Sequence, residues 1–190
     1  MSHLKRLSTP TTWPLARRKG IKFIARPLPG PHKLNESITI NHLLKEVLNY
    51  AKATREVKLI LNSKRILVNN KIIKEHRFPV GLFDMISIPE SNEHYTPLYD
   101  KYGKFYLKKI SKELAELKFE KITNKKILKN KKIQINLHNG NNLLVKKDTF
   151  KVGDTLVLKN KEILKQLKFE KGALIYLTSG RNKGKSGILE

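Results

Sequence analysis

The fold is decided by one stretch of the sequence, Ile66-Leu67-Val68-Asn69-Asn70-Lys71-Ile72-Ile73. Two apolar runs flank the pair Asn69-Asn70, and asparagine accepts a positive φ more readily than most residues. The stretch therefore predicts a tight β-hairpin with the two asparagines at its turn. A further strand-like run, Phe78 to Ile88, follows, with Pro79 and Gly81 at its entry.

Two helices are expected just before this hairpin. Apolar residues recur at helical spacing from Leu43 to Ala51 and again from Val57 to Leu61. Thr39 or Asn41 can cap the first helix, and Thr54 can cap the second. The order helix, helix, hairpin, strand predicts a compact module.

The residues after this module read mostly as β-structure. The run Ile133-Gln134-Ile135-Asn136-Leu137 alternates apolar and polar residues and leads into Asn139-Gly140, a strong hairpin signal. Several short strands separated by turn residues favour a small barrel or curled sheet. Lysines crowd one expected connection, where phosphate contact and plain solvation both stay open: Lys125, Lys126, Lys129, Lys131 and Lys132.

The N-terminal residues 1–37 are expected to form an extended arm. Five prolines exclude a long helix. The first 33 residues hold eight basic side chains, and the first carboxylate in the chain is Glu36. We predict that residues 1–33 are disordered until a polyanionic partner orders them. Trp13 is expected to stack on a base or to anchor in a neighbouring pocket.

The charge of the whole chain points to nucleic acid. Its 190 residues include 40 Lys and Arg against 16 Asp and Glu, a formal net charge of +24. An acidic membrane surface is the other natural polyanion, but we find neither a lipidation signal nor an amphipathic helix with exposed aromatics. No apolar run approaches the roughly 20 residues of a transmembrane helix, and no secretory signal is found. We therefore expect a cytoplasmic protein that binds nucleic acid, with no membrane, no small-molecule substrate and no homo-oligomer.

Metal and nucleotide chemistry are not expected. The chain has no cysteine, and its six histidines lie far apart in the sequence. Glycines at 180, 184 and 187 allow a close approach to phosphate. Gly180 lies four residues before Gly184-Lys185-Ser186, however, which is not the spacing of an ATP-binding loop. We predict no cofactor.

Motifs along nearly the whole chain occur in the order of a known family. They are Leu4-Lys5-Arg6-Leu7 with Pro10 and Trp13, Pro29-Gly30-Pro31-His32, Tyr50-Ala51-Lys52-Ala53-Thr54-Arg55-Glu56-Val57, Phe78-Pro79-Val80-Gly81-Leu82-Phe83-Asp84, Ile135-Asn136-Leu137-His138-Asn139-Gly140, Gly153-Asp154-Thr155-Leu156 and Gly180-Arg181-Asn182-Lys183-Gly184. Each is weak alone. The ordered set resembles the S4e family, the archaeal and eukaryotic-type small-subunit ribosomal proteins.

The resemblance implies a multidomain α+β fold in four parts. These are an extended basic N-terminal arm at 1–37, an S4-type RNA-binding module (αα-β) at 38–90, a central, mostly β, barrel-like domain at 91–170 and an incomplete KOW-type segment at 171–190. It also implies a function. The chain would be a structural constituent of the small ribosomal subunit that binds small-subunit ribosomal RNA, supports its folding and assembly, and adjoins other small-subunit proteins.

RNA usually lies against the helices and hairpin of an S4-type module. The resemblance therefore implies RNA contacts from the arm, the module and the last glycine-rich loop: Lys5, Arg6, Trp13, Arg17, Arg18, Lys19, Arg26, His32, Lys52, Arg55, Lys58, Lys64, Arg65, Lys71, Lys74, Arg181 and Lys183. Arg55 stands on the motif's arginine and is the strongest candidate, because a guanidinium grips phosphate bidentately.

Three features depart from the family pattern. Asn70 stands where such hairpins commonly have glycine, so we expect the turn to be kept at some conformational cost. Asn141 stands where a basic residue would be expected, which weakens RNA contact at that loop. The chain stops at Glu190, inside the KOW-type segment, and the sequence does not explain why.

Two alternative functions stay open: an assembly or RNA-modification accessory factor with an S4-type module, and a KOW-type transcription factor. An enzyme would need a separate catalytic domain, and no glycine-rich strand-to-helix loop of a methyltransferase is found. The candidate catalytic aspartates sit beside expected turns: Asp84, Asp100, Asp148 and Asp154. We therefore expect no enzymatic activity.

Overall fold

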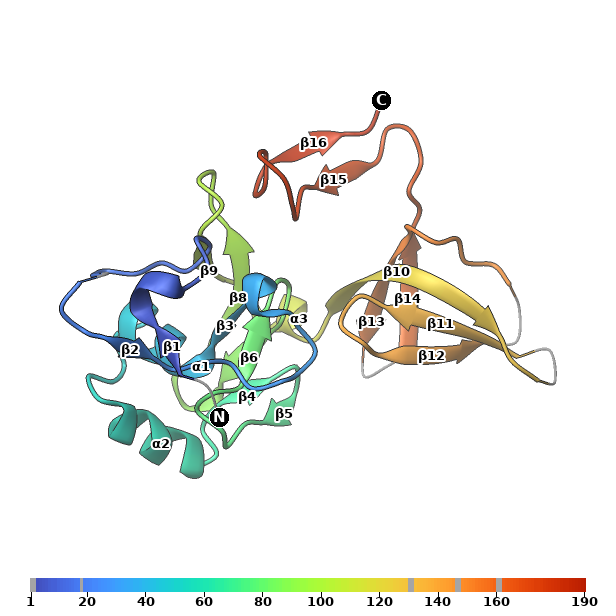
Figure 1. Ribbon diagram of the computed structural model, residues 1–190. Helices are drawn as coiled ribbons and strands as arrows, with labels where there is room; N and C mark the ends of the chain where they lie inside the picture. The colour runs from blue at the N-terminus through green and yellow to red at the C-terminus, as the bar shows by residue number, and fades with distance from the viewer. Residues whose placement is uncertain (1–2, 18, 130–131, 146–147, 160–161) are drawn as a thin grey trace. The chain divides into compact units, whose positions relative to one another are not determined.

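The computed structural model describes residues 3–17, 19–129, 132–145, 148–159 and 162–190 (Figure 1). They form a mixed structure of many short strands and few helices. One compact unit runs to Ala115 and includes Tyr176–Lys185, and the other comprises Glu116–Ile175 and Ser186–Glu190.

The first compact unit extends to Ala115, past residue 90, where the resemblance implies that the RNA-binding module ends. The reason is strand pairing: β7 (Ile86–Ile88) pairs with β8 (Glu93–Tyr99), and β8 pairs with β9 (Phe105–Lys109). These strands complete a five-stranded antiparallel sheet of order β5-β4-β7-β8-β9. The 3-10 turn Pro89–Ser91 and helix α3 (Lys112–Ala115) lie before and after the added pair.

The predicted hairpin is confirmed. β4 (Leu67–Val68) pairs with β5 (Lys71–Ile72), with Val68 opposite Lys71. Asn69 and Asn70 have φ values of 51° and 62°, so both lie in the left-handed region that this turn requires. Asn70 thus takes the conformation for which glycine is the usual residue.

Both predicted helices are present, but the first ends at Val47, before the predicted Ala51, and the second differs at its cap. The first starts as α1 (Ile40–His42) and continues as a π-helical turn, Leu43–Val47, and the Thr39 hydroxyl accepts a hydrogen bond from the backbone N–H of His42 as predicted. The second, α2, spans Thr54–Asn62. Thr54 is its first helical residue and not its cap. The Glu56 carboxylate instead accepts from the backbone N–H groups of Lys52 and Ala53, at 2.7 and 3.3 Å.

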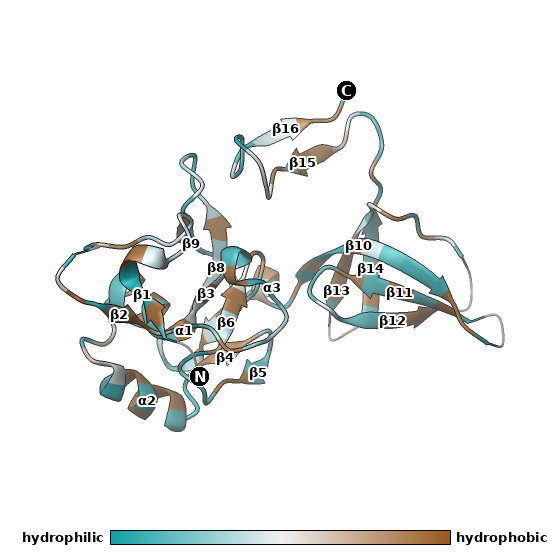
Figure 2. Cartoon of the chain, in the orientation of Figure 1, coloured by the Kyte–Doolittle hydropathy of each residue, from teal (hydrophilic) through white to brown (hydrophobic). Residues whose placement is uncertain are grey.

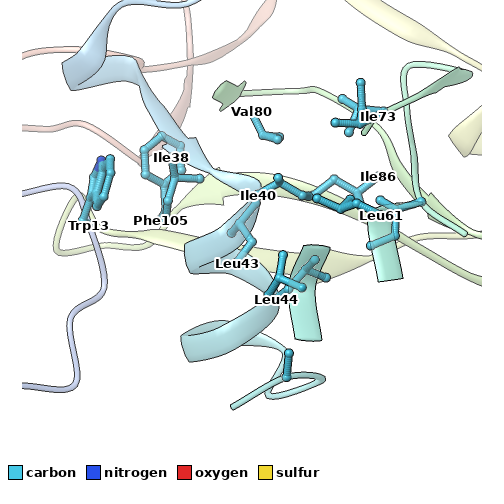
Figure 3. Packing of buried hydrophobic residues seen from close by; sticks show 14 of the residues in the cluster. Trp13, Ile38, Ile40, Leu43, Leu44, Leu61, Ile73, Val80, Ile86 and Phe105 are labelled. Atoms are coloured by element: carbon cyan, nitrogen blue, oxygen red, sulfur yellow. The ribbon is translucent and has the colours of Figure 1, made fainter. Parts of the chain in front are cut away.

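The core of the first unit collects side chains from distant parts of the chain (Figure 3). Ile38 and Ile40 come from β3 (Ser37–Thr39) and the start of α1, and Leu61 comes from α2. β3 pairs with β6 (Pro79–Gly81) in a two-stranded sheet. Trp13, from the N-terminal segment, belongs to the same core.

The N-terminal segment is therefore not an arm that waits for a partner. Its strands β1 (Leu4–Lys5) and β2 (Phe23–Ile24) pair antiparallel, and it also holds two 3-10 turns, Arg6–Ser8 and Leu34–Glu36. It approaches β6 so closely that a Cβ on Gly30 would lie 2.6 Å from a Pro79 side-chain carbon. The expected disorder of residues 1–33 is therefore wrong for the described residues, since this segment pairs two strands and packs apolar side chains against the core. The prediction failed because the local composition does not reveal these distant contacts.

The second unit is a five-stranded antiparallel sheet of order β12-β11-β10-β13-β14. The strands are β10 (Lys118–Ile127), β11 (Ile133–Leu137), β12 (Asn142–Val145), β13 (Thr155–Lys159) and β14 (Glu162–Leu167). β10 is long and curved (Figure 1), and its first half pairs with β13 while its second half pairs with β11. Its curvature lets one strand cover a small core that includes Ile122, Ile135 and Leu156.

The expected lysine-rich connection is mostly strand. Lys125 and Lys126 lie in β10, and both pair with residues of β11. Lys129 and Lys132 lie in the turn region between these strands, and Lys131 falls outside the described residues. The predicted strand Ile133–Leu137 has the bounds of β11.

The last residues form a hairpin in which β15 (Leu174–Tyr176) and β16 (Ser186–Ile188) make a two-stranded sheet. The connection between them belongs to the first unit. There the Tyr176 hydroxyl donates to the backbone carbonyl of Tyr99 at 3.1 Å and accepts from its N–H at 2.8 Å.

Candidate nucleic-acid interface

A basic surface covers α2 and the hairpin that follows it. Val57 and Leu61 turn one side of α2 into the core, so Arg55 and Lys58 are left on its exposed side. In Figure 2, α2 carries both hydrophobic and hydrophilic colours. We call the exposed cations of this region the helix–hairpin face: Lys52, Arg55, Lys58, Lys64, Lys71 and Lys74.

The cations of the helix–hairpin face are not neutralised by the protein. Within the part of the chain that the structure describes, none of the six makes an ion pair. The adjacent Arg65 does pair, at 2.9 Å from Glu90, but both side chains are exposed and such pairs contribute little. Positive charge at this density favours an anionic ligand.

The potential of this face acts on a neighbouring histidine. Partial burial lowers the pKa of His76 below its ordinary value. Glu75 opposes the shift, whereas the charges of Lys58 and Arg77 add to it. His76 is thus held toward its neutral form beside the basic face.

Arg6, predicted to contact RNA, has an internal partner instead. One of its terminal nitrogens donates to both Glu46 carboxylate oxygens, at 2.6 and 2.5 Å, and its side chain is only 5% exposed. Glu46 also lies 3.5 Å from the ring of His42. A buried guanidinium that already grips a carboxylate has no fork left for phosphate, so Arg6 is a structural residue.

Trp13 is also corrected, because it is 1% exposed. Its indole N–H donates to the Ser37 carbonyl at 2.8 Å, and its ring lies 5.5 Å from that of His42. No base can stack on a covered ring. The other alternative, an anchor in a pocket, fits this position, and the pocket is the protein's own core.

His32 holds the N-terminal segment to the hairpin module through Asp84. Its Nε2 lies 2.9 Å from Asp84 Oδ2, while Asn69 donates to the other oxygen at 2.8 Å. The backbone N–H of Gly81 also donates to Asp84. A Cβ on Gly81 would lie 2.4 Å from the His32 ring, so only glycine admits the ring here. His32 is therefore a packing residue and not a surface contact.

The Asp84 carboxylate is buried but well supplied with donors. Burial alone would raise its pKa, but the hydrogen bonds from His32, Asn69 and Gly81 together lower it below the ordinary value. The carboxylate stays charged and links the N-terminal segment, the hairpin turn and β6.

Arg26 lines a cleft of about 530 Å³ together with Arg77, Leu28 and Leu34. The Arg77 side chain donates to the Arg26 carbonyl at 2.9 Å. Arg26 is half-buried and is one of the residues that line this cleft.

The last glycine-rich loop is only partly available. The Lys183 ammonium lies 3.9 Å from the centre of the Tyr99 ring, and burial lowers its pKa. A Cβ on Gly184 would lie 2.4 Å from the Asp100 carbonyl oxygen, so glycine permits this close approach. Arg181 is exposed at the same loop.

The remaining N-terminal candidates differ in what can be said of them. Lys5, Arg17 and Lys19 are exposed, whereas Arg18 lies outside the described residues. Sequence reasoning did not single out Phe23, an exposed aromatic ring on β2. The only signal was that Phe23 and Ile24 point to opposite faces of a strand. A strand of two residues cannot be recognised in the sequence when its partner β1 is unknown.

Metal and membrane features were also sought in the described residues. They contain no group of three or more His, Asp or Glu side chains placed to hold a metal ion. None of their helices combines the length and apolarity that crossing a bilayer requires.

Comparison with known proteins identifies the family. The small ribosomal subunit protein eS4 of Methanocaldococcus jannaschii is 40% identical over 192 residues, which cover 96% of this chain and 78% of that protein. The eS4 protein of Archaeoglobus fulgidus is 39% identical over 190 residues, covering 99% and 79%. The chain belongs to the S4e family of ribosomal proteins. The S4e ribosomal family model matches residues 91–163, and the RS4NT domain model matches residues 2–35.

A solved S4e structure agrees with the fold. The crystal structure of the 30S ribosomal protein S4e from Thermoplasma acidophilum superposes with a TM-score of 0.71 at 29% identity, covering 80% of each chain. This S4e chain thus keeps the mixed, strand-rich architecture. Among the predicted contacts, Arg6 and His32 have internal partners, whereas the cations of the helix–hairpin face are exposed and make no ion pair among the described residues.

Proposed function

We propose that this S4e chain is a structural constituent of the small ribosomal subunit that binds small-subunit ribosomal RNA and supports its folding and assembly. It would act in the cytoplasmic ribosome beside other small-subunit proteins. The relatives are named as small ribosomal subunit proteins, and the observation that carries the RNA contact is the unpaired helix–hairpin face.

In this proposal the helices and hairpin of residues 38–90 act as an S4-type RNA-binding module. Phosphates lie against the exposed cations, with Arg55 as the main contact because its planar fork takes a phosphate bidentately. The remaining proposed contacts are Lys5, Arg17, Lys19, Lys52, Lys58, Lys64, Arg65, Lys71, Lys74 and Arg181. The second unit acts as the central β domain, and β15–β16 as a KOW-type segment.

The mechanism is positioning and not catalysis. Many phosphate contacts fix the protein's register on a folded RNA, and the fold of the RNA is recognised by its shape. The core that Trp13, His32 and Arg6 help to build keeps the face rigid, so little ordering cost falls on binding.

Sedimentation of a cell extract through a density gradient, followed by a high-salt wash, tests this function. A structural protein runs with the small subunit at one copy per subunit and survives the wash. Recovery at the top of the gradient, or at far less than one copy, would instead favour an assembly factor, an RNA-modification accessory factor or a transcription protein.

A further inference from the structure

The hairpin β1–β2 carries an aromatic ring on its outer side. Phe23 is 47% exposed, although it lies in a strand whose neighbour Ile24 packs against the core. Because side chains alternate between the faces of a strand, Leu4 and Ile24 share the inner face. Leu4 is buried there. The outer face is left to Phe23 and to Lys5, which pairs with it across the two strands.

Cations and a histidine surround this ring. The Lys22 ammonium lies 5.4 Å from the ring centre, within the range of a cation–π contact. The His3 ring lies 5.3 Å from it, tilted by 46°. Lys5 is exposed on the same side. The hairpin is held in register by a further backbone hydrogen bond of 3.0 Å, from Arg6 N–H to the Lys22 carbonyl.

The charge around the ring has one sign. No carboxylate occurs in the sequence before Glu36, and Glu46, which contacts Arg6 next to this hairpin, is already paired with Arg6. An apolar partner that covered Phe23 would have to desolvate Lys5 and Lys22 without offering an anion, which is costly. A partner that brings a flat π-surface and an anion together avoids that cost.

We infer that the outer face of β1–β2 is a stacking site for one unpaired nucleobase of an RNA strand. The base lies on Phe23, and Lys5 and Lys22 take the phosphates on either side of it. This inference rests on the proposed function, since it names a subsite of an RNA-binding protein. Base–aromatic stacking tolerates any base, so the site selects for an unpaired nucleotide and not for a sequence.

The test measures binding of the full-length chain to unstructured RNA oligonucleotides that contain 2-aminopurine, and to small-subunit ribosomal RNA. In Phe23→Ala we expect oligonucleotide affinity to fall about 5- to 100-fold. Phe23→Trp and Phe23→Tyr should keep affinity within about twofold of the wild type, whereas Phe23→Leu, which keeps apolar area but no π-face, should lose it like alanine. 2-Aminopurine fluorescence should be quenched by the wild type and not by Phe23→Ala.

Charge and stacking are separated by the salt dependence. Phe23→Ala should leave the slope of log affinity against log salt unchanged, while Lys22→Gln should reduce it by about 0.7. Thermal unfolding of each variant shows whether the hairpin still folds, and Phe23→Tyr serves as the folded reference.

The outcomes distinguish this inference from the function on which it rests. If the wild type binds no RNA at low salt, the proposed function fails and the subsite fails with it. If the wild type binds with a steep salt dependence but Phe23→Ala binds equally well, only the stacking site is overturned. If Phe23→Ala loses binding to an acidic polyglutamate peptide but not to RNA, the face is a protein-docking site and the inference is again wrong.

Discussion

Arg6 and Arg55 carry the same guanidinium group, and both were predicted from the sequence to contact RNA. In the N-terminal segment, Arg6 is buried against Glu46, and on α2, Arg55 is exposed without an ion pair among the described residues. The charge count of a segment predicts that it has an anionic partner. It does not say whether that partner is RNA or a carboxylate 40 residues further along the chain.

The difference lies in what each region buries. The N-terminal segment contributes Leu4 and Trp13 to the core, so the polar groups beside them must find partners inside the protein. The helix–hairpin region buries only one side, through Val57 and Leu61, and its cations stay in water. The account therefore assigns the buried residues of the first region to stability and the exposed cations of the second region to most of the phosphate contacts, while the outer face of β1–β2 adds a stacking site.

The largest effect is expected at Trp13. Trp13→Ala removes a fully covered indole and leaves the Ser37 carbonyl without its donor, so the free energy of unfolding should fall by about 4 kcal/mol. Denaturant unfolding measures it. Phe23→Ala, also in the N-terminal segment but half exposed, is the control and should cost less than about 1 kcal/mol. Equal losses would show that Trp13 is not part of the core.

A matched arginine pair gives the next effect. Arg6→Met leaves the Glu46 carboxylate without its main partner and should lower the free energy of unfolding by about 2 to 3 kcal/mol. Arg55→Met should change it by less than about 0.5 kcal/mol. The same denaturation curves give both values. Stability losses of similar size in the two variants would remove the distinction between the regions.

A smaller effect is expected from Asp84 and should depend on pH. Its folded-state pKa lies below the ordinary value of 3.8, so the carboxylate stabilises the fold above about pH 4, and this contribution is lost as pH falls through the folded pKa. At pH 7, Asp84→Asn should lower the free energy of unfolding by about 1.5 kcal/mol. Between pH 5 and 2 the variant should lose less stability than the wild type. Parallel curves for the two proteins over that range would contradict this role, and Asp148→Asn, an exposed carboxylate, is the control.

Local patterns predicted the parts of the fold that local physics decides. The hairpin at Asn69-Asn70 and the strand Ile133–Leu137 depend on turn preference and alternation, which are visible in the sequence. The strand β10 was missed over its lysine-rich end because Lys125 and Lys126 look like a solvated connection when their partner strand is unknown. In the same way, β8 was not predicted as part of the first unit, since its membership depends on pairing with β7.

The residues of the candidate site also divide into those that local patterns could predict and those that depend on distant partners. The exposure of Arg55 and Lys58 follows from the helical periodicity of α2, whereas the RNA contacts of these two residues and of the lysines beside them were implied by the family resemblance and stay a prediction. Arg6, Trp13 and His32 could not be assigned correctly, because their partners Glu46, Ser37 and Asp84 lie far away in the sequence. Lys183 was likewise predicted to contact RNA, but its ammonium lies against the Tyr99 ring, which is far from it in the sequence.

The central claim is that the helix–hairpin face supplies most of the phosphate contacts to the RNA. It is tested most directly by the salt dependence of binding to small-subunit ribosomal RNA, comparing the wild type with a variant in which Lys52, Arg55, Lys58 and Lys71 are all glutamine. We expect the slope of log affinity against log salt to become shallower by about 3, with the free energy of unfolding unchanged. An unchanged slope in a folded variant would contradict the account, because the RNA would then be held elsewhere.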